Sequence, residues 1–288
     1  MNSLSFSLNL WNDLQSMWAY SFMQHAFEAG TIVAIVAGVV GYFVVLRRLA
    51  FAAHALSHIG FAGAAGAILA SLNPLIGLLV FTTGGSAVMA SLGRRSTNRD
   101  TQVGTVLAFM LGLGVLFISL YKGYATEAYS LLFGEILGIS SGDVLATLIA
   151  GLLTLLVMAL FYRRLLFASL DADVAQAKGV SVSSIHFIFM VLIALATAIS
   201  VQVVGVLLIF ALMVTPAAAA QCSTKRPAQG LAVTVGIALF VTWLGLFVSF
   251  YVPYPVSFFI TTSTFIIYLA ARLLRRTPAH PPITAEYN

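Results

Sequence analysis

The stretch from residue 22 to residue 48, FMQHAFEAGTIVAIVAGVVGYFVVLRR, joins a long apolar run to a pair of arginines. An apolar segment of about 20 residues is long enough to cross the hydrocarbon core of a bilayer as an α-helix. Basic residues that flank such segments collect on the cytoplasmic side of the membrane. This stretch therefore predicts a spanning helix that reaches the cytoplasmic surface at Arg47 and Arg48.

The same arrangement recurs along the whole chain, in which 60% of residues are hydrophobic and only 8% are charged. It predicts an all-α, polytopic membrane helix bundle of eight or nine spans. Nine is preferred, because nine alternating crossings place every one of the 14 basic residues except Lys122 on one side. That count puts the N-terminus outside and the C-terminus in the cytoplasm. The expected spans are about 22–46, 51–71, 75–93, 103–121, 144–162, 183–201, 203–222, 230–251 and 256–274.

The spans leave no stretch long enough for a separate soluble domain. Residues 1–21 predict an N-terminal interfacial segment, residues 22–276 a single transmembrane domain, and residues 277–288 a cytoplasmic tail. The apolar stretch at about 128–141 is too short to cross, and both a re-entrant and an interfacial position are open to it. The net charge of +5 is explained by cytoplasmic loops and gives no reason to expect a nucleic-acid partner.

Two histidines lie four residues apart in the second span, FAAHALSHIGFAGAAGAILAS (51–71). Residues at i and i+4 share a helix face, so His54 and His58 point the same way. Ionisable side chains inside membranes usually mark an ion or substrate path, and paired imidazoles suit Zn, Cu, Fe or Ni. Two histidine ligands alone would hold a metal ion weakly, which suits an ion that must leave the site again. The alternative is that each histidine donates an interhelical hydrogen bond.

Two further residues within the spans are candidates for function. Glu28, in the first span, could offer a carboxylate to an entering cation; equally, it could bond a neighbouring helix or extend toward the surface. Pro216, in the seventh span, removes a backbone hydrogen bond and could act as a hinge, or could be a tolerated membrane proline.

A short cytoplasmic helix is predicted within residues 169–180, between the fifth and sixth spans. Asp171 is a good N-cap, Asp173 suits the first turn, Lys178 suits the last turn and Gly179 suits the position after it. A transporter driven by a cytoplasmic ATPase needs a rigid element that the ATPase can move. An ordinary amphipathic connector is the alternative.

Several catalytic motifs are missing from the sequence. The dipeptide Gly-Lys does not occur, so the chain has no P-loop for ATP. H-E-x-x-H does not occur, and no group of residues indicates covalent catalysis. We therefore expect a transport subunit and not an enzyme, with any ATP hydrolysis carried out by a separate chain.

Several collinear segments resemble one family, the bacterial ABC-3 permeases, which are membrane subunits of zinc, manganese and iron importers. They include VVLRRLAFAAHALSHIGFAGAAGAIL (44–69), SLDADVAQAKGVSV (169–182) and VQVVGVLLIFALMVTPAAAAQ (201–221). The resemblance extends from about residue 22 to residue 276. It implies a homodimer in the bacterial cytoplasmic membrane, which works by alternating access with an ABC ATPase and an extracytoplasmic metal-binding protein.

The resemblance also assigns roles to residues. It makes 169–180 the ATPase-coupling segment, with Asp171, Asp173, Lys178 and Gly179 as its residues. It also places His54 and His58 on the path of a transported divalent metal, with no cofactor bound by the chain. The usual family pattern has Asp where this chain has His54, and imidazole in place of carboxylate favours Zn²⁺ over Mn²⁺.

Three alternatives remain open at this stage. An iron–siderophore or cobalamin-type ABC permease would usually have ten spans and lacks this histidine pair. An ATP-independent secondary metal transporter would work in vesicles without any ATPase. An intramembrane enzyme would need a catalytic pair of residues, which the sequence does not offer.

Overall fold

The computed structural model describes residues 16–92, 99–121, 134, 136, 138–224, 226–252 and 254–274. All regular structure in these ranges is helical, and nine of the helices are long and apolar enough to cross a membrane. They are α2 (Ser21–Leu46), α3 (Ala50–Leu69), α4 (Pro74–Leu92), α5 (Arg99–Leu120), α7 (Ser141–Leu170), α9 (Val182–Val204), α10 (Val206–Ser223), α11 (Pro227–Tyr251) and α12 (Val256–Leu274). The prediction of an all-α bundle with nine spans is confirmed, whereas the orientation of the termini stays a prediction.

Most predicted spans agree with these helices to within three or four residues, but the fifth is much longer than expected. α7 has 30 residues and continues to Leu170, past the predicted end at residue 162. Arg163 and Arg164 mark where the helix leaves the apolar layer; they do not end it, because arginine is a good helix former. At its start, Ser140 and Asp143 form a capping box that satisfies the first free backbone N–H groups.

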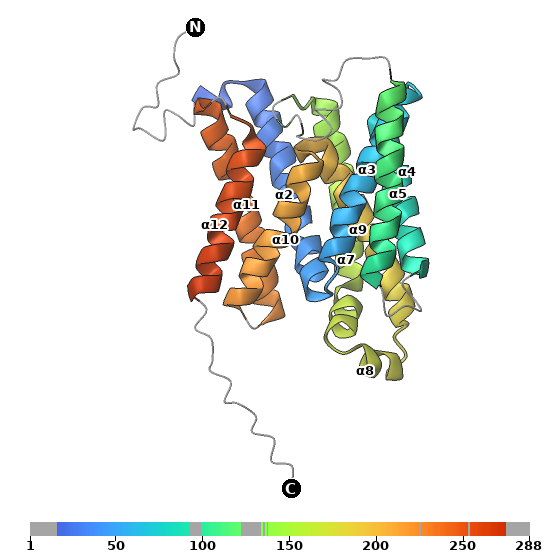
Figure 1. The fold of residues 1–288 in the computed structure, drawn as a ribbon. Helices are drawn as coiled ribbons and strands as arrows, with labels where there is room; N and C mark the ends of the chain where they lie inside the picture. Colours follow the sequence, from blue (N-terminus) through green and yellow to red (C-terminus); the bar gives the residue numbers. More distant parts are fainter. Residues whose placement is uncertain are drawn as a thin grey trace.

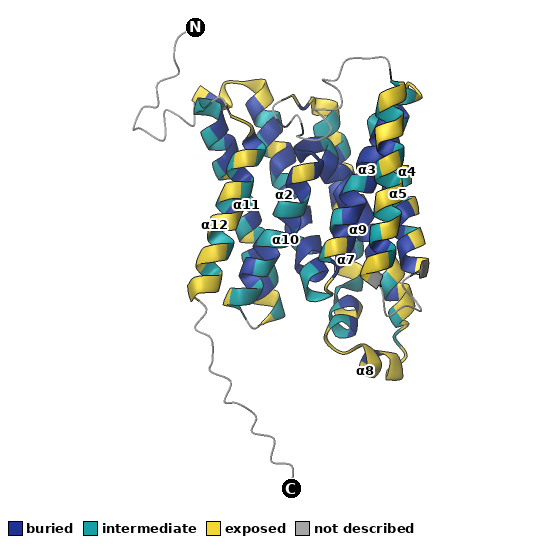
Figure 2. Cartoon of the chain, viewed as in Figure 1, coloured by how far each residue is buried: buried dark blue, intermediate teal, exposed yellow. Residues whose placement is uncertain are grey.

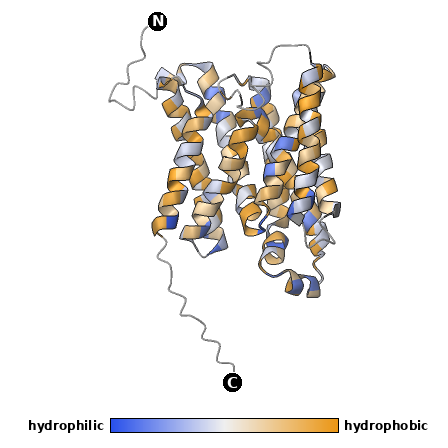
Figure 3. Ribbon diagram, in the orientation of Figure 1, coloured by the Kyte–Doolittle hydropathy of each residue, from blue (hydrophilic) through white to orange (hydrophobic). Residues whose placement is uncertain are grey.

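The spans pack side by side, and the short helix α8 (Ala172–Ala177) hangs below them at the end of the bundle where the chain's last helix also ends (Figure 1). α3 packs against α4, α5 and α9, whereas α2 packs against α7, α9, α10 and α11. Apolar residues dominate the spans, and hydrophilic residues are prominent on α8 (Figure 3). A helix that projects from the apolar layer in this way is accessible to a soluble partner.

Burial separates central helices from those that face lipid (Figure 2). α2, α3 and α9 are largely buried within the chain, whereas α5, α7 and α12 expose large apolar side chains such as Phe109, Leu160 and Leu273. Exposed apolar residues are expected where lipid is the solvent. The Ala- and Gly-rich second span is therefore central, as its composition predicts.

The central helices approach closely through glycine. A Cβ atom built at Gly63 of α3 would overlap the backbone carbonyl of Gly77 in α4, and a Cβ at Gly77 would overlap that of Gly63. Small residues allow this approach, which replaces the hydrophobic effect as the source of helix association in lipid.

We expect Gly63→Ala to destabilise the protein by about 1–3 kcal/mol, because the added methyl group must push α3 and α4 apart. Gly84→Ala is a matched control in α4, since a Cβ there meets no atom within 4 Å. It should leave stability unchanged or raise it slightly through helix propensity. Thermal unfolding of the two detergent-solubilised variants tests this, and an equal midpoint for both would contradict the packing account.

The connection between the sixth and seventh spans lies at Gly205, not near Gln202 as the sequence suggested. Gln202 is inside the last turn of α9, where its side-chain amide donates to Asp143 at 2.9 Å. Gly205 joins the two helices alone, with φ at 82°, a conformation that residues with a Cβ rarely adopt. A single glycine can therefore replace the longer loop that helix pairs usually need.

Candidate functional site

His54 and His58 form a close pair on α3. Their ring centres are 4.7 Å apart, and their planes are nearly perpendicular at 84°. Two imidazoles that bind one ion through bonds of about 2.1 Å have ring centres at most roughly 6.5 Å apart. The spacing observed here is within that limit, so the distance between the rings permits a shared metal ion.

The two histidines occupy the open strip of a helix that is otherwise buried. Between Ala52 and Ala65, His54 and His58 alone are not buried among the residues of α3. Residues packed inside a bundle do not meet a passing ion, whereas this strip is accessible. The strip is the part of central helix α3 on which a transported ion could make contact.

The imidazoles have no hydrogen-bond partner in the described part of the chain. Nδ1 of His54 is shielded from solvent and makes no hydrogen bond to a described residue. A buried polar atom without a partner is unusual and points to a missing ligand or water. The alternative in which each histidine holds a neighbouring helix through a hydrogen bond receives no support from these residues.

A phenylalanine of α10 borders the pair, which the sequence did not indicate. The rings of Phe210 and His54 are 4.8 Å apart at an angle of 64°. On α10 a strip of partly exposed residues continues from Phe210 through Val214 and Ala218 at helical spacing. We call His54, His58, Phe210, Val214 and Ala218 the α3–α10 face.

One copy of the chain does not supply a complete metal site at this face. No group of three or more His, Cys, Asp or Glu side chains is placed to hold a metal within the described residues. Closed structural zinc sites use four protein ligands. A site with two protein ligands binds a metal ion weakly, which suits an ion in transit. A second copy of the chain that added its own histidine pair would bring the number of ligands to four.

The predicted short helix is present as α8, although it is shorter than the range 169–180. Ser169 and Leu170 belong to α7, and α8 begins at Ala172. Asp171 caps α8 as predicted, because its carboxylate accepts from the Val174 N–H at 2.9 Å. Gly179 follows the helix with φ at 82°, the left-handed conformation that suits a helix end.

α8 is anchored by one buried residue and leaves most of its surface exposed. Ala175 is 0% exposed and anchors the helix, while Asp173 in the first turn is exposed. Lys178 places its ammonium 5.9 Å from the ring centre of Phe167 in α7. Val174 is 44% exposed, an apolar side chain on a helix outside the apolar layer. Val174 could not be identified from the sequence, because only the structure shows which apolar residue of the helix faces outward.

The end of α7 that carries α8 is tied to α2. Arg47 donates to the Ser169 hydroxyl at 3.3 Å, and its guanidinium lies 5.6 Å from the ring centre of Phe189 in α9. Cation–π contacts and hydrogen bonds of this kind fix the relative position of helix ends. These contacts connect the end of α7 next to α8 with α2 and α9.

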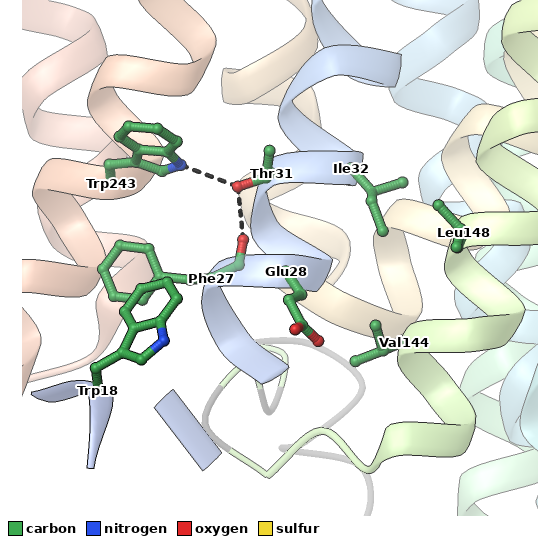
Figure 4. Close-up of a pocket in the computed structure, with 8 residues that line it drawn as sticks. All are labelled: Trp18, Phe27, Glu28, Thr31, Ile32, Val144, Leu148 and Trp243. Atoms are coloured by element: carbon green, nitrogen blue, oxygen red, sulfur yellow. Dashed lines mark hydrogen bonds between the residues drawn. The ribbon is translucent and has the colours of Figure 1, made fainter. Parts of the chain in front are cut away.

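The structure does not bring Glu28 to the histidine pair. Glu28 lines a groove between α2, α7 and α11, with Trp18 and Trp243 on one side and Val144 on the other (Figure 4). No residue of α3 or α10 lines this groove. Pro216 is buried inside α10, which continues as one helix on both sides of it, and its hinge role stays a prediction.

A family model described as the ABC 3 transport family matches residues 19–275. The chain belongs to the ABC 3 transport family. It is thus a multi-pass protein of the bacterial cytoplasmic membrane and the permease subunit of an ABC transporter, not an enzyme itself. The resemblance drawn from the sequence segments is confirmed.

Curated relatives of this ABC 3 family chain include manganese transport proteins. It is 31% identical over 238 residues to the manganese transport system membrane protein MntC of Listeria monocytogenes, covering 82% of this chain and 85% of the relative. It is 31% identical over 257 residues to the manganese import system permease protein ScaB of Streptococcus parasanguinis, covering 89% and 91%. The names of these relatives give no support to the expectation of zinc.

Solved structures of the same build are also known. A chain of PsaBC from Streptococcus pneumoniae in complex with Fab superposes with a TM-score of 0.83, at 28% identity, covering 93% of this chain and 96% of that one. An inward-facing putative metal-chelate type ABC transporter superposes with a TM-score of 0.73 at 16% identity, covering 94% and 92%, which shows a shared fold.

Proposed function

We propose that this ABC 3 family permease imports a divalent first-row transition metal ion, and that the ion passes His54 and His58. The observation that carries the proposal is the open strip of α3, where a buried helix leaves two adjacent imidazoles partly exposed and Nδ1 of His54 without a hydrogen bond. Manganese is the metal in the names of the relatives, and imidazole is also a ligand for zinc and iron.

The permease works as a homodimer in this proposal. Two copies that meet through the α3–α10 face would bring four imidazoles to one passage and complete a site that one copy leaves at two ligands. The small side chain of Ala218 permits close approach of two helices in lipid. The ion path then lies between the two subunits.

Transport follows an alternating-access cycle driven from the cytoplasm. An extracytoplasmic metal-binding protein delivers the ion, and a separate ABC ATPase docks on α8. ATP binding and hydrolysis displace α8, and the Arg47 contacts carry that movement to α2 and α9. The histidine pair is thereby opened to one side of the membrane and closed to the other.

Reconstitution separates this proposal from a secondary transporter. Proteoliposomes that contain the permease and its ATPase, supplied with the metal-binding protein, should take up Mn²⁺ or Zn²⁺ only when ATP is present. An imposed proton gradient without the ATPase should give no uptake. Uptake that follows the proton gradient and ignores ATP would contradict the ABC mechanism.

His54 contributes to the choice of metal in this proposal. We expect His54→Asp to raise the ratio of Mn²⁺ to Zn²⁺ uptake by roughly tenfold, because a carboxylate suits the harder ion and imidazole suits the borderline one. Competition between the two radiolabelled ions in proteoliposomes measures the ratio. His25→Asp is the matched control on α2 and should leave the ratio unchanged; an equal change in both variants would exclude selection at His54.

A further inference from the structure

The groove that contains Glu28 is a cavity distinct from the histidine pair. It has a volume of about 590 Å³, within the range of small-molecule sites. Its apolar walls come from α2, α7 and α11, and they include Phe27 and Leu148. Trp18 and Trp243, which are 52% and 50% exposed, border it on one side (Figure 4).

Glu28 is the one polar group of this lining left with an unmet charge. Two neighbouring polar groups bond each other: the Trp243 indole N–H donates to the Thr31 hydroxyl at 3.0 Å, and that hydroxyl donates to the Phe27 carbonyl at 2.6 Å. The exposed Glu28 carboxylate makes no hydrogen bond or ion pair with any residue the structure describes. Its countercharge must come from outside this part of the chain.

The depth of Glu28 indicates what can supply that charge. It lies seven residues into α2, which starts at Ser21, and is thus about 10 Å below the start of the helix. Tryptophan is enriched at headgroup depth, and two tryptophans flank this groove. The carboxylate is therefore near the boundary between headgroups and acyl chains, where an unpaired charge is costly.

We propose that the groove binds a phospholipid with a primary ammonium headgroup, of the phosphatidylethanolamine type. The ammonium donates to the Glu28 carboxylate, and an acyl chain lies along the apolar walls. A hydrated metal ion would find a single carboxylate among apolar residues, whereas this lipid matches both features. The inference needs only that the chain spans a membrane, so it stands apart from the proposed cargo and from the His54–His58 path.

Charge-assisted hydrogen bonds are the stronger kind, and the headgroups of common phospholipids differ in their ability to make one. A primary ammonium offers three N–H donors, the quaternary ammonium of phosphatidylcholine offers none, and phosphatidylglycerol is anionic. The groove should therefore prefer phosphatidylethanolamine to phosphatidylcholine, and phosphatidylcholine to phosphatidylglycerol.

Fluorescence quenching by lipids with brominated acyl chains can test this preference, because the groove has its own reporters. The chain contains three tryptophans, and Trp11→Phe leaves only Trp18 and Trp243, which both line the groove. This variant is placed in vesicles of phosphatidylcholine that contain increasing fractions of brominated phosphatidylethanolamine, phosphatidylcholine or phosphatidylglycerol. We expect roughly tenfold stronger apparent binding of phosphatidylethanolamine than of phosphatidylcholine.

Three substitutions in that background decide the role of Glu28. Glu28→Gln should abolish the preference, Glu28→Asp should keep it, and Asp100→Asn, which removes an exposed carboxylate outside the groove, should not change it. Equal quenching by all three lipids in the Trp11→Phe protein would overturn the proposal. So would a preference that survives in Glu28→Gln, or a preference for phosphatidylglycerol.

Discussion

Replacing both His54 and His58 with alanine should reduce ATP-dependent metal uptake to the background of vesicles without the transporter. The two rings are the accessible ligands on the central helix, and their ring centres are 4.7 Å apart. Loss of even an outer partner of a metal ligand costs about 10–100-fold in affinity, so loss of both ligands should reduce uptake by at least roughly 100-fold. Uptake of radiolabelled Mn²⁺ and Zn²⁺ by proteoliposomes measures it.

The double variant should still fold and bind its ATPase. Both side chains are only partly buried, so their removal disturbs the packed bundle less than the loss of a core residue would. Co-purification with the ATPase and ATP hydrolysis by the complex serve as controls. Phe210→Leu is a matched variant on the same face that removes a ring and no metal ligand, and it should keep most uptake. Normal uptake by the double variant would remove the histidine pair from the path.

Val174→Arg should prevent assembly with the ATPase. Val174 is an exposed apolar residue on α8, and its burial by a partner would contribute to docking, whereas a buried arginine without a partner would oppose it. Residues at the centre of interfaces commonly contribute about 2 kcal/mol or more, so binding should weaken by at least roughly 30-fold. Affinity of the purified permease for the ATPase, and loss of uptake in proteoliposomes, are the measurements.

Gln176→Arg provides the comparison within the same helix. It introduces the same charge at an exposed position of α8, while Ala175 still anchors the helix in both variants. We expect it to weaken ATPase binding much less than Val174→Arg does. If both variants bind the ATPase as tightly as the unaltered chain, α8 is a connector and the coupling role assigned to residues 169–180 is wrong.

Features set by local sequence could be predicted well. Span positions follow from apolar length and from the basic residues at their ends, and the α8 caps at Asp171 and Gly179 follow from side-chain chemistry and backbone freedom. The shared face of His54 and His58 follows from the helical repeat. α7 was underestimated because the sequence shows where a helix leaves the membrane but not how far it continues beyond it.

Features set by the contact of distant segments could not be predicted. Two features of His54 depend on how α3 packs against α10: its buried Nδ1 has no hydrogen bond, and its ring contacts Phe210. Glu28 looked like a candidate for the metal path, yet its groove is made by α2, α7 and α11, away from the histidine pair. The metal itself depends on a complete ligand set, and one copy of the chain supplies only two imidazoles.

X-ray absorption of Zn²⁺ bound to the reconstituted permease–ATPase complex, without ATP, counts the imidazole ligands around the ion and so shows whether the ion binds at the histidine pair. We expect more than two imidazoles per Zn²⁺, because each of two copies contributes His54 and His58, and we expect that signal to be lost in the double alanine variant. A spectrum without imidazole scattering, or one that is the same in the double variant, would contradict the proposed path.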